Sequence, residues 1–272
     1  MNYINALTIA GSDSGGGAGI QADLKTFSAL GCFGTCVITA VTAQNTLGVK
    51  SVHALPVEII RDQLQAILGD IKPAAIKIGM INQPDVVEVI REELSGYDQN
   101  IPIILDPVMI ATSGDRLIEP DTIDQLKEKL FPLVTLVTPN IDEAIMLSGQ
   151  SINNVEEMIS AGQKIINQGA KAVLVKGGHL SGPIIYDVLI DGAREPVILE
   201  GNFIKSSNLH GTGCTLSSAI AAEMAKGNNL LTAVKKAKAY ITNAILTGRG
   251  IKTGEGNGPL NHFFNPLKLI VQ

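Results

Sequence analysis

The sequence predicts an α/β protein in which one central, mostly parallel sheet lies between two layers of helices. Short apolar runs alternate with amphipathic stretches along most of the 272 residues. The runs are continuously apolar, as expected of strands that are covered on both faces. No linker, repeat or low-complexity segment interrupts the alternation. This βαβα rhythm is typical of a three-layer α/β/α architecture, so we expect residues 1–272 to form a single domain.

The expected elements follow the chain in order. Six apolar runs are the expected strands of the sheet: Ala6–Ala10, Val37–Thr42, Ala75–Ile78, Pro102–Leu105, Leu133–Val137 and Ala172–Val175. Apolar residues that recur at three- and four-residue steps predict helices, and Val57–Leu68 shows this spacing. The expected helices of this part are Ile20–Leu30, Val57–Leu68, Pro84–Leu94, Pro120–Leu130 and Val155–Gln168. The rhythm changes at Ile184–Ile190 and Pro196–Leu199, where Asp191-Gly192 predicts a hairpin turn. Two long helices, Thr212–Ala225 and Leu230–Thr247, and a Gly-rich tail follow.

Composition and charge exclude several classes of protein. Hydrophobic residues make up 45% of the chain and charged ones 17%, which gives enough apolar surface for a core and excludes a disordered or coiled-coil protein. The net charge of -5 argues against a nucleic-acid or anionic-membrane partner. Cys32, Cys36 and Cys214 lack C-x-x-C spacing, so we expect neither a disulfide framework nor a structural zinc site. Without a basic N-terminal region or a long apolar run, the chain is expected to be soluble and cytoplasmic.

The first segment that indicates chemistry is the glycine-rich stretch 11–19, between a strand and a helix. Ile20 and Ala22 stand where a G-x-G-x-x-G pattern requires glycine, and the Gly-Lys-Ser/Thr of a P-loop is missing. A flexible turn is one interpretation. The other is a small-molecule contact, because open α/β sheets bind ligands at the carboxyl ends of their strands. Asp23, one turn into the next helix, either points a carboxylate at a bound polar group or is a solvated helix residue.

The second segment is His210-Gly211-Thr212-Gly213-Cys214-Thr215, which opens an apolar helix. Glycines allow an anion to approach the backbone, and the free N–H groups of a helix start form a positive cradle. We expect the helix dipole to lower the pKa of the Cys214 thiol from about 8.5. A thiol there could take a proton from an attacking hydroxyl while the cradle stabilises a transferring phosphate. The alternative is an ordinary Gly-rich helix start followed by a buried cysteine.

These segments carry a resemblance to a known family. Gly-Thr-Gly-Cys at 211–214 resembles the Gly-x-Gly-Asp anion hole of the ribokinase superfamily, with Cys replacing the catalytic Asp as in its vitamin-kinase branch. Segments 10–25 and 40–46 resemble bacterial hydroxymethylpyrimidine kinase/phosphomethylpyrimidine kinase of thiamin synthesis. Further matching segments are Lys77-Ile-Gly-Met80, Leu105-Asp-Pro-Val-Met109, Thr138-Pro-Asn-Ile-Asp-Glu143 and Lys176-Gly-Gly-His179. The match runs in register over nearly the whole chain and implies a ribokinase-like fold.

The resemblance also implies a role for each matching residue. The residues implied to line the pyrimidine pocket are Gln44, Met80, Asp23, Val108 and Gly11. Those implied for the catalytic anion hole are Gly211, Thr212, Gly213 and Cys214, and those for ATP are Lys176, Asp106 and Thr212. Those implied for Mg²⁺, largely through water, are Asn140, Glu143 and Asp106. The amide of a glutamine suits an aminopyrimidine edge because it offers a donor and an acceptor together.

Several of these residues have ordinary structural alternatives. Taken in isolation, Asn140 with Glu143 is first interpreted as a helix N-cap with a favourable first-turn acid, whereas Asp106 could equally cap a turn. Gln44 is otherwise a polar residue at a strand end, and His210, like His179, His53 and His262, is by default a loop or core histidine. Many relatives carry Lys where this chain has Thr112, which moves phosphate neutralisation toward Lys176 and the backbone cradle and leaves Thr112 a weak site candidate.

The leading hypothesis is an ATP- and Mg²⁺-dependent kinase of 4-amino-5-hydroxymethyl-2-methylpyrimidine and of its monophosphate. The alternatives are a pyridoxine/pyridoxal kinase, a kinase of both ring types, and a non-catalytic vitamin-binding or sensor protein on the same fold. The intact Gly211–Cys214 segment counts against a mere binder, which has no need of an anion hole beside a thiol. The family also suggests a homodimer.

Overall fold

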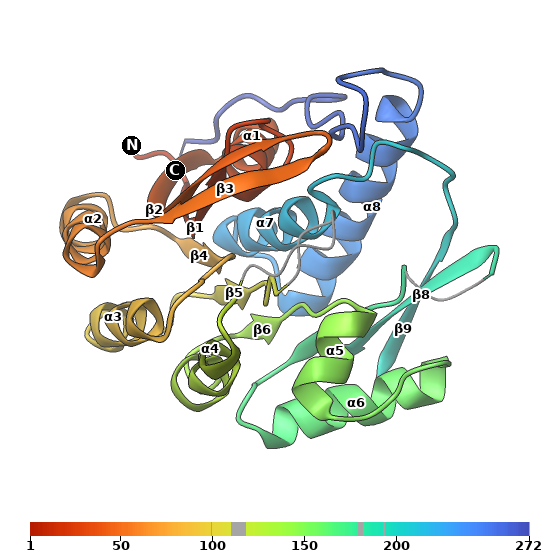
Figure 1. Ribbon diagram of the computed structural model, residues 1–272, viewed down its shortest axis with the longest axis horizontal. Coiled ribbons are helices and arrows are strands. Elements are labelled where there is room, and N and C mark those ends of the chain that lie inside the picture. The colour runs from red at the N-terminus through yellow and green to blue at the C-terminus, as the bar shows by residue number, and fades with distance from the viewer. Residues whose placement is uncertain (99, 110–117, 179–181, 193, 272) are drawn as a thin grey trace.

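A single sheet runs through the described part of the protein (Figure 1). The computed structural model describes residues 1–98, 100–109, 118–178, 182–192 and 194–271. Within these ranges the strands lie in the order β3-β2-β1-β4-β5-β6-β7-β8-β9. Their bounds are β1 Asn5–Asp13, β2 Phe33–Asn45, β3 Gly48–Ala54, β4 Ala75–Ile78, β5 Ile103–Leu105, β6 Leu136–Val137, β7 Val173–Lys176, β8 Ile184–Ile190 and β9 Val197–Asn202.

The central strands of this sheet are parallel, as the sequence predicts. Six consecutive strands of the sheet are parallel to one another: β2, β1, β4, β5, β6 and β7. At the two ends of the sheet the pairing is antiparallel, between β2 and β3 at one end and between β7, β8 and β9 at the other. The carboxyl ends of parallel strands meet at one edge of a sheet, and that edge is where ligands bind in such folds. The loops after β1, β4, β5, β6 and β7 therefore reach a common site.

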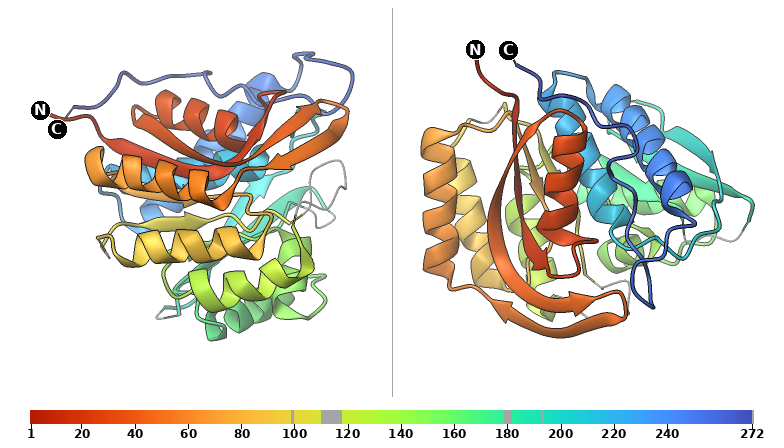
Figure 2. Two further views of the ribbon diagram at one scale, coloured as in Figure 1. Left: turned by 60° about the vertical axis from the view of Figure 1, so that its left-hand side comes forward. Right: turned by 90° about the horizontal axis from the view of Figure 1, so that it is seen from above.

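Helices cover both faces of the sheet and complete the expected three layers (Figures 1 and 2). Their bounds are α1 Gly19–Ala29, α2 Val57–Asp70, α3 Pro84–Ser95, α4 Pro120–Gln125, α5 Ile141–Ser148, α6 Val155–Asn167, α7 Thr212–Ala225 and α8 Leu230–Gly248. One core cluster lies between the sheet and the helices from α2 through α6, and it includes Leu7 and Ile9 of β1. The other core cluster lies between the sheet and helices α1, α7 and α8, and it includes Ala6 of β1. Neighbouring residues of β1 thus face different cores, which is why the strand is apolar without alternation.

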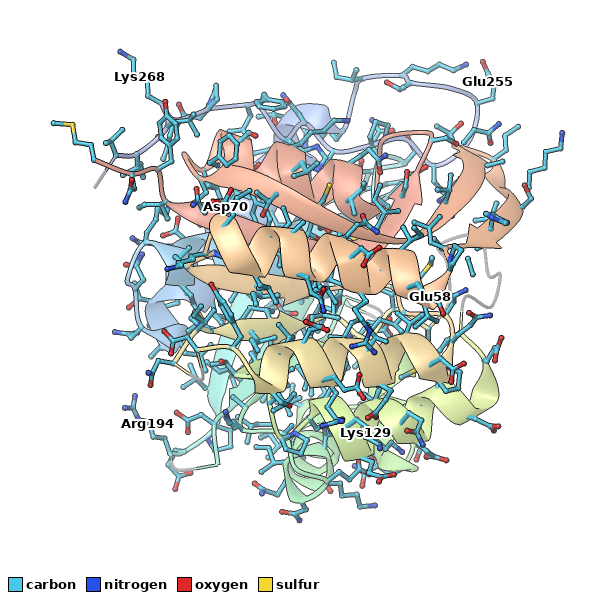
Figure 3. All side chains as sticks on the ribbon, turned by 90° about the vertical axis from the view of Figure 1, so that its left-hand side faces the viewer. Glu58, Asp70, Lys129, Arg194, Glu255 and Lys268 are labelled. Atoms are coloured by element: carbon cyan, nitrogen blue, oxygen red, sulfur yellow. The ribbon has the colours of Figure 1, made fainter. Side chains whose placement is uncertain are left out.

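Charged side chains lie on the outer surface of the helical layer. Figure 3 shows the side chains of Glu58 and Asp70 of α2 and of Lys129 on the outer side of the helical layer. Within the described ranges, no helix has both the length and the apolar character that crossing a membrane requires.

The structure differs from the predicted elements in five places. The strand predicted over Leu133–Val137 is only Leu136–Val137, because residues 133–135 belong to the turn and bend that lead into it. Strand β3 was not predicted, because it extends β2 as a ribbon and its residues 50–53 are exposed, so it lacks a buried apolar run. Helix α5 was not predicted because it is only 8 residues long. The predicted helix over 120–130 forms, but its second half, Leu126–Leu130, is π-helical. The predicted hairpin β8–β9 also forms, although its connection spans residues 191–196 rather than a two-residue turn.

The Gly-rich tail is a strap that runs back along the molecule (Figure 1). It accepts a hydrogen bond from the His210 N–H at the Gly258 carbonyl, and the Asn257 N–H donates to the Thr46 carbonyl at the tip of the β2–β3 ribbon. Near its end, Val271 forms a β-bridge with Tyr3. The two ends of the chain therefore lie side by side (Figure 2).

Candidate active site

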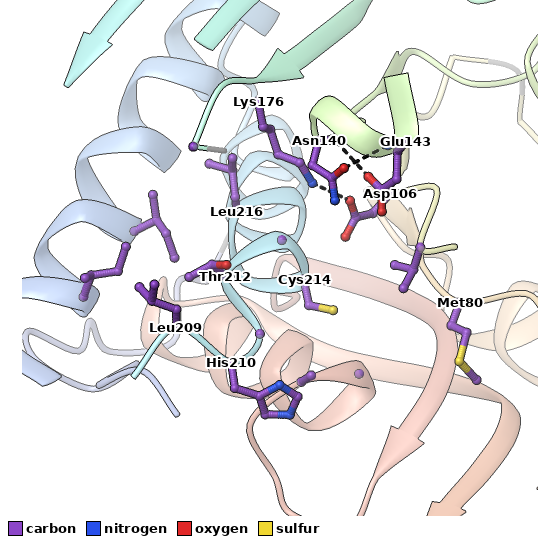
Figure 4. A pocket seen from close by; sticks show the side chains of 18 of the residues that line it. Met80, Asp106, Asn140, Glu143, Lys176, Leu209, His210, Thr212, Cys214 and Leu216 are labelled. Carbon is purple, nitrogen blue, oxygen red and sulfur yellow. Dashed lines mark hydrogen bonds and ion pairs between the residues drawn. The ribbon is translucent and has the colours of Figure 1, made fainter. Parts of the chain in front are cut away.

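A cavity of about 640 Å³ opens at the carboxyl edge of the sheet. Segments that are far apart in the sequence line it: the end of β1, the β2–β3 ribbon, the loops after β4 to β7, and the start of α7 (Figure 4). The predicted site residues that line this cavity are Gly11, Gln44, Met80, Asp106, Val108, Asn140, Glu143, Lys176, Gly211, Thr212, Gly213 and Cys214. Thr112 and His179 lie outside the described residues.

The start of α7 is the predicted anion cradle. Gly211 is its N-cap residue at φ 84°, and no side chain caps the helix. A Cβ at Gly211 would overlap the Gly17 carbonyl, so glycine is required where the two glycine-rich loops meet. The first-turn N–H groups have no intrahelical acceptors and carry the positive end of the helix dipole. The geometry therefore fits an anion held against residues 211–214.

The expected low pKa of Cys214 is wrong. Burial raises the pKa of the Cys214 thiol to about 11; Lys77 lowers it, whereas Asp23 and Asp106 raise it further. The helix start does not offset the loss of solvation, because a thiolate loses more water than one dipole and one lysine return. At neutral pH the protein therefore presents a thiol at this position.

Behind the cradle lies a buried ion pair between the ends of β5 and β7. Lys176 Nζ is 2.9 Å from Asp106 Oδ1, and the Thr138 hydroxyl donates to the same oxygen at 3.1 Å. Burial opposes ionisation of Asp106, but Lys176 and Lys77 outweigh it, so the pKa of this carboxyl is lowered. An added Cβ on Gly213 would lie 3.3 Å from Lys176 Nζ. A charged lysine thus stands directly behind the anion cradle.

Asn140 and Glu143 at the start of α5 form the capping box that was the structural alternative for these residues. Asn140 Oδ1 accepts from the Glu143 N–H at 2.9 Å, and Glu143 Oε2 accepts from the Asn140 N–H at 2.8 Å. Burial raises the pKa of Glu143 to about 7; Lys176 lowers it and Asp106 raises it. Figure 4 shows the two carboxyl side chains beside each other.

This pair of acids fits a cation that keeps part of its water. Among the described residues, no cluster of three or more His, Cys, Asp or Glu side chains could form a protein cage for a metal. Mg²⁺ binds through one or two carboxylates plus water and substrate phosphates. Asp106 and Glu143 supply hard oxygen ligands of this kind.

Asp23 is not a pocket residue, contrary to the prediction. Its side chain is fully buried below the cavity, where Lys77 Nζ lies 2.9 and 3.0 Å from its two oxygens. The hydroxyls of Thr8 and Ser218 also donate to it, each at 2.6 Å. The carboxylate joins β1, α1, β4 and α7 and does not face a ligand.

Gly11, Gln44, Met80 and Val108, which were predicted to hold the pyrimidine, line the cavity near the ends of β1, β2, β4 and β5, and we call this part of the cavity the acceptor side. A Cβ on Gly11 would overlap the methyl group of Met80, so this glycine makes room for the methionine. Asp13 and His210 also line this part of the cavity, and the sequence did not predict that they form a pair. His210 Nε2 lies 2.9 Å from Asp13 Oδ2. The only signal for them was an acid at a strand end within one glycine-rich loop and a histidine beside the other.

A second arm of the cavity was also missed. It lies between the ends of β8 and β9 and α8, and its lining residues include Ile185, Phe203, Ile241 and Ile245 with the paired Asp187 and Lys238. These residues form no motif, because β strands and a helix face contribute them singly. Apart from the pair of Asp187 and Lys238, the residues named for this arm are apolar, and we refer to it as the apolar arm.

Comparison with known proteins decides the family. The family model described as phosphomethylpyrimidine kinase matches residues 13–261. The chain belongs to this family. It is 49% identical over 259 residues to a hydroxymethylpyrimidine/phosphomethylpyrimidine kinase of Rhizobium meliloti (strain 1021), covering 95% of this chain and 96% of that one.

Solved structures agree with the family and with the ribokinase-like fold. The crystal structure of a phosphomethylpyrimidine kinase from Clostridium difficile 630 matches with a TM-score of 0.78 at 46% identity, covering 89% of this chain and 99% of that chain. A pyridoxal kinase from Staphylococcus aureus, in complex with AMP-PCP and pyridoxal, matches with a TM-score of 0.88 at 34% identity over 98% of this chain and 97% of that chain. The protein is thus a kinase of the vitamin-kinase group.

Proposed function

We propose that the protein is a cytoplasmic, single-domain kinase that uses ATP and Mg²⁺ to phosphorylate 4-amino-5-hydroxymethyl-2-methylpyrimidine and then its monophosphate. One observation carries the proposal: the anion cradle at 211–214, the apolar arm and the residues of the acceptor side all line one cavity. A nucleotide whose base occupies the arm would place its terminal phosphate at the cradle. The family and the 49% identical kinase relative support this substrate class.

The residues divide the work as phosphoryl transfer requires, which is mainly positioning and charge stabilisation. The cradle N–H groups and Lys176 hold the transferring phosphoryl group, and Gln44 and Met80 hold the pyrimidine so that its hydroxymethyl group faces Cys214. Asp106 and Glu143, with Asn140 at the same helix start, are the residues that would hold Mg²⁺. The ion would supply charge neutralisation for the phosphates.

In this proposal Cys214 takes the proton of the acceptor hydroxyl. Because its pKa is about 11, the thiolate is a minor species at neutral pH and Lys77 and Lys176 must favour it in the ternary complex. A loose transition state lowers the demand on the base, since the acceptor oxygen becomes acidic only as its new bond to phosphorus forms. Turnover should therefore rise with pH above neutrality.

Single-turnover rates test the role of Cys214. Cys214→Ala should lose 10²–10⁴-fold, the usual contribution of a general base, while ATP and pyrimidine binding persist. Cys214→Asp should retain part of the rate, with a weaker dependence on pH between 7 and 9. Cys36→Ala, at a partly exposed cysteine of β2, is the matched control. A loss of less than about tenfold for Cys214→Ala would remove the thiol from the mechanism.

A pyridoxal kinase activity is the second candidate. It is favoured by the TM-score of 0.88 to a pyridoxal kinase in complex with pyridoxal. ATP turnover measured with the pyrimidine alcohol, its monophosphate and pyridoxine separates the two activities and identifies a dual-specificity enzyme. Turnover with none of the three would favour a binding protein.

We further propose a homodimer. The ribbon of β2 and β3 exposes Val41, Leu47 and Val52, which are 45%, 70% and 44% accessible and offer apolar surface to a second copy. Sedimentation equilibrium decides the point, because a mass equal to one chain at all concentrations would contradict it.

A further inference from the structure

Four side chains on the acceptor side of the cavity form a hydrogen-bonded chain. His210 Nε2 lies 2.9 Å from Asp13 Oδ2 and 3.3 Å from Gln44 Nε2. At the other end of that amide, Thr42 Oγ1 lies 3.2 Å from Gln44 Oε1 and 2.9 Å from the Ser12 carbonyl. Each donor and acceptor along this chain can be assigned from its neighbours.

The assignment starts at Asp13. Its Oδ1 accepts from the Gly15 N–H at 2.8 Å, and its Oδ2 accepts from the N–H groups of Gly17 and Ala18 at 3.0 and 2.9 Å. Burial opposes ionisation, but hydrogen bonds from His210, Ala18 and Gly15 outweigh it and lower the pKa of Asp13. Asp13 is therefore a carboxylate that only accepts, so the hydrogen of His210 must be on Nε2.

Thr42 fixes the other end of the chain. The Ser12 carbonyl can only accept, so the single hydroxyl hydrogen of Thr42 points to it. The lone pairs of Thr42 Oγ1 then accept from Gln44. At the first end, the Nε2–H group of His210 donates to Asp13 and has no lone pair for a Gln44 NH₂ group, so only the oxygen of Gln44 fits beside it, where it can share the same hydrogen.

The two ends of the Gln44 amide are therefore assigned. An amide exchanges its oxygen and nitrogen by a half-turn about its last bond, with little change of shape. We infer that the Gln44 amide takes the half-turned orientation, the reverse of the contacts given above, with its oxygen on His210 and its NH₂ group on Thr42. His210 and Thr42 then determine which way round the amide meets a bound ring. Both are positioning residues for substrate specificity, and this role rests on the proposed function of Gln44 as the pyrimidine ligand.

The consequence is discrimination between ring edges. A 4-aminopyrimidine presents a donor beside an acceptor, whereas a 4-oxopyrimidine presents an acceptor beside an N–H donor. An amide fixed one way round matches only one of these orders. The other order requires a half-turn of Gln44 that breaks its hydrogen bonds to both His210 and Thr42, which corresponds to about 10- to 100-fold in affinity.

The test compares the dissociation constants of the 4-amino substrate and its 4-oxo counterpart by calorimetry, without turnover. The protein should prefer the amino ring by at least about tenfold. Thr42→Val and His210→Phe each remove one constraint and should reduce the preference to within about threefold, whereas Thr42→Ser keeps the hydroxyl and should preserve it. The ratio is unaffected by a loss of affinity that both rings share, so general damage to the pocket does not imitate the expected result.

Two results would overturn the inference. In one, Thr42→Val and His210→Phe keep the full preference while Gln44→Leu abolishes it, so Gln44 reads the ring unaided and the proposed function stands. In the other, Gln44→Leu also keeps the preference, and the pyrimidine pocket itself is misassigned. Independently of any ligand or variant, the ¹⁵N spectrum of His210 should show its hydrogen on Nε2, and a bare Nε2 would contradict the assignment.

Discussion

Lys77→Met should lower the free energy of unfolding more than most other single substitutions near the site. Lys77 and Asp23 are both fully buried, and the ammonium lies 2.9 and 3.0 Å from the two carboxylate oxygens. Methionine fills similar space but leaves the carboxylate with only the hydroxyls of Thr8 and Ser218, each at 2.6 Å. Removing one partner of a buried ion pair costs about 3–5 kcal/mol, because the other charge stays without compensation.

The free energy of unfolding measures this cost, by urea titration followed by far-UV circular dichroism, since the chain contains no Trp. The double variant Asp23→Leu/Lys77→Met is the control. It removes both charges and should recover part of the loss, because apolar replacement of a buried pair is often close to neutral. A loss below about 1 kcal/mol for Lys77→Met, or a double variant less stable than the single one, would show that Asp23 does not depend on Lys77 for its charge.

Two further predictions concern the surroundings of the cradle. Gly211→Ala should reduce ATP affinity and turnover at least about tenfold, because its Cβ would push the Gly17 carbonyl away. The control is Gly227→Ala, at the same φ of 84° but with open space around it, which should change only the free energy of unfolding, by about 1 kcal/mol. Equal kinetic effects of the two variants would refute the steric reasoning. Burial, and secondarily Lys25, lowers the pKa of His262 from 6.5 to about 4. The neutral, buried His262 therefore contributes about 3 kcal/mol to the free energy of unfolding above pH 6.5, and this contribution is lost as the pH falls toward 4. Unfolding curves of His262→Gln, measured over this pH range, should lack this part of the acid destabilisation.

The sequence predicts the frame of the fold because its strands are covered on both faces. The run Ala6–Ala10 is apolar throughout since its neighbours in the chain enter different cores. The same signal could not reveal β3, whose residues 50–53 are exposed. The cradle at 211–214 was predictable because local backbone chemistry, two glycines at a helix start, is enough to form it.

What failed depends on the fold rather than on local sequence. The first-turn position of Cys214 predicts a low pKa, but the surrounding protein buries the thiol and raises the pKa to about 11. Asp23 lies on the expected helix, yet only the pairing of β4 with β1 brings Lys77 into contact with it. The apolar arm draws single residues from β8, β9 and α8, and no spacing in the sequence joins them.

The bridge between Tyr3 and Val271 has a practical consequence for handling this protein. Strand β1 starts beside that bridge at Asn5 and ends at Asp13 in the cavity, so both chain ends lie at the far edge of the sheet, about 30 Å from the site at about 3.3 Å per residue. A purification tag or a second catalytic module attached to either end would extend away from the mouth of the cavity. A short peptide joining residue 272 to residue 1 would likewise close the chain into a ring without crossing the path by which substrates enter.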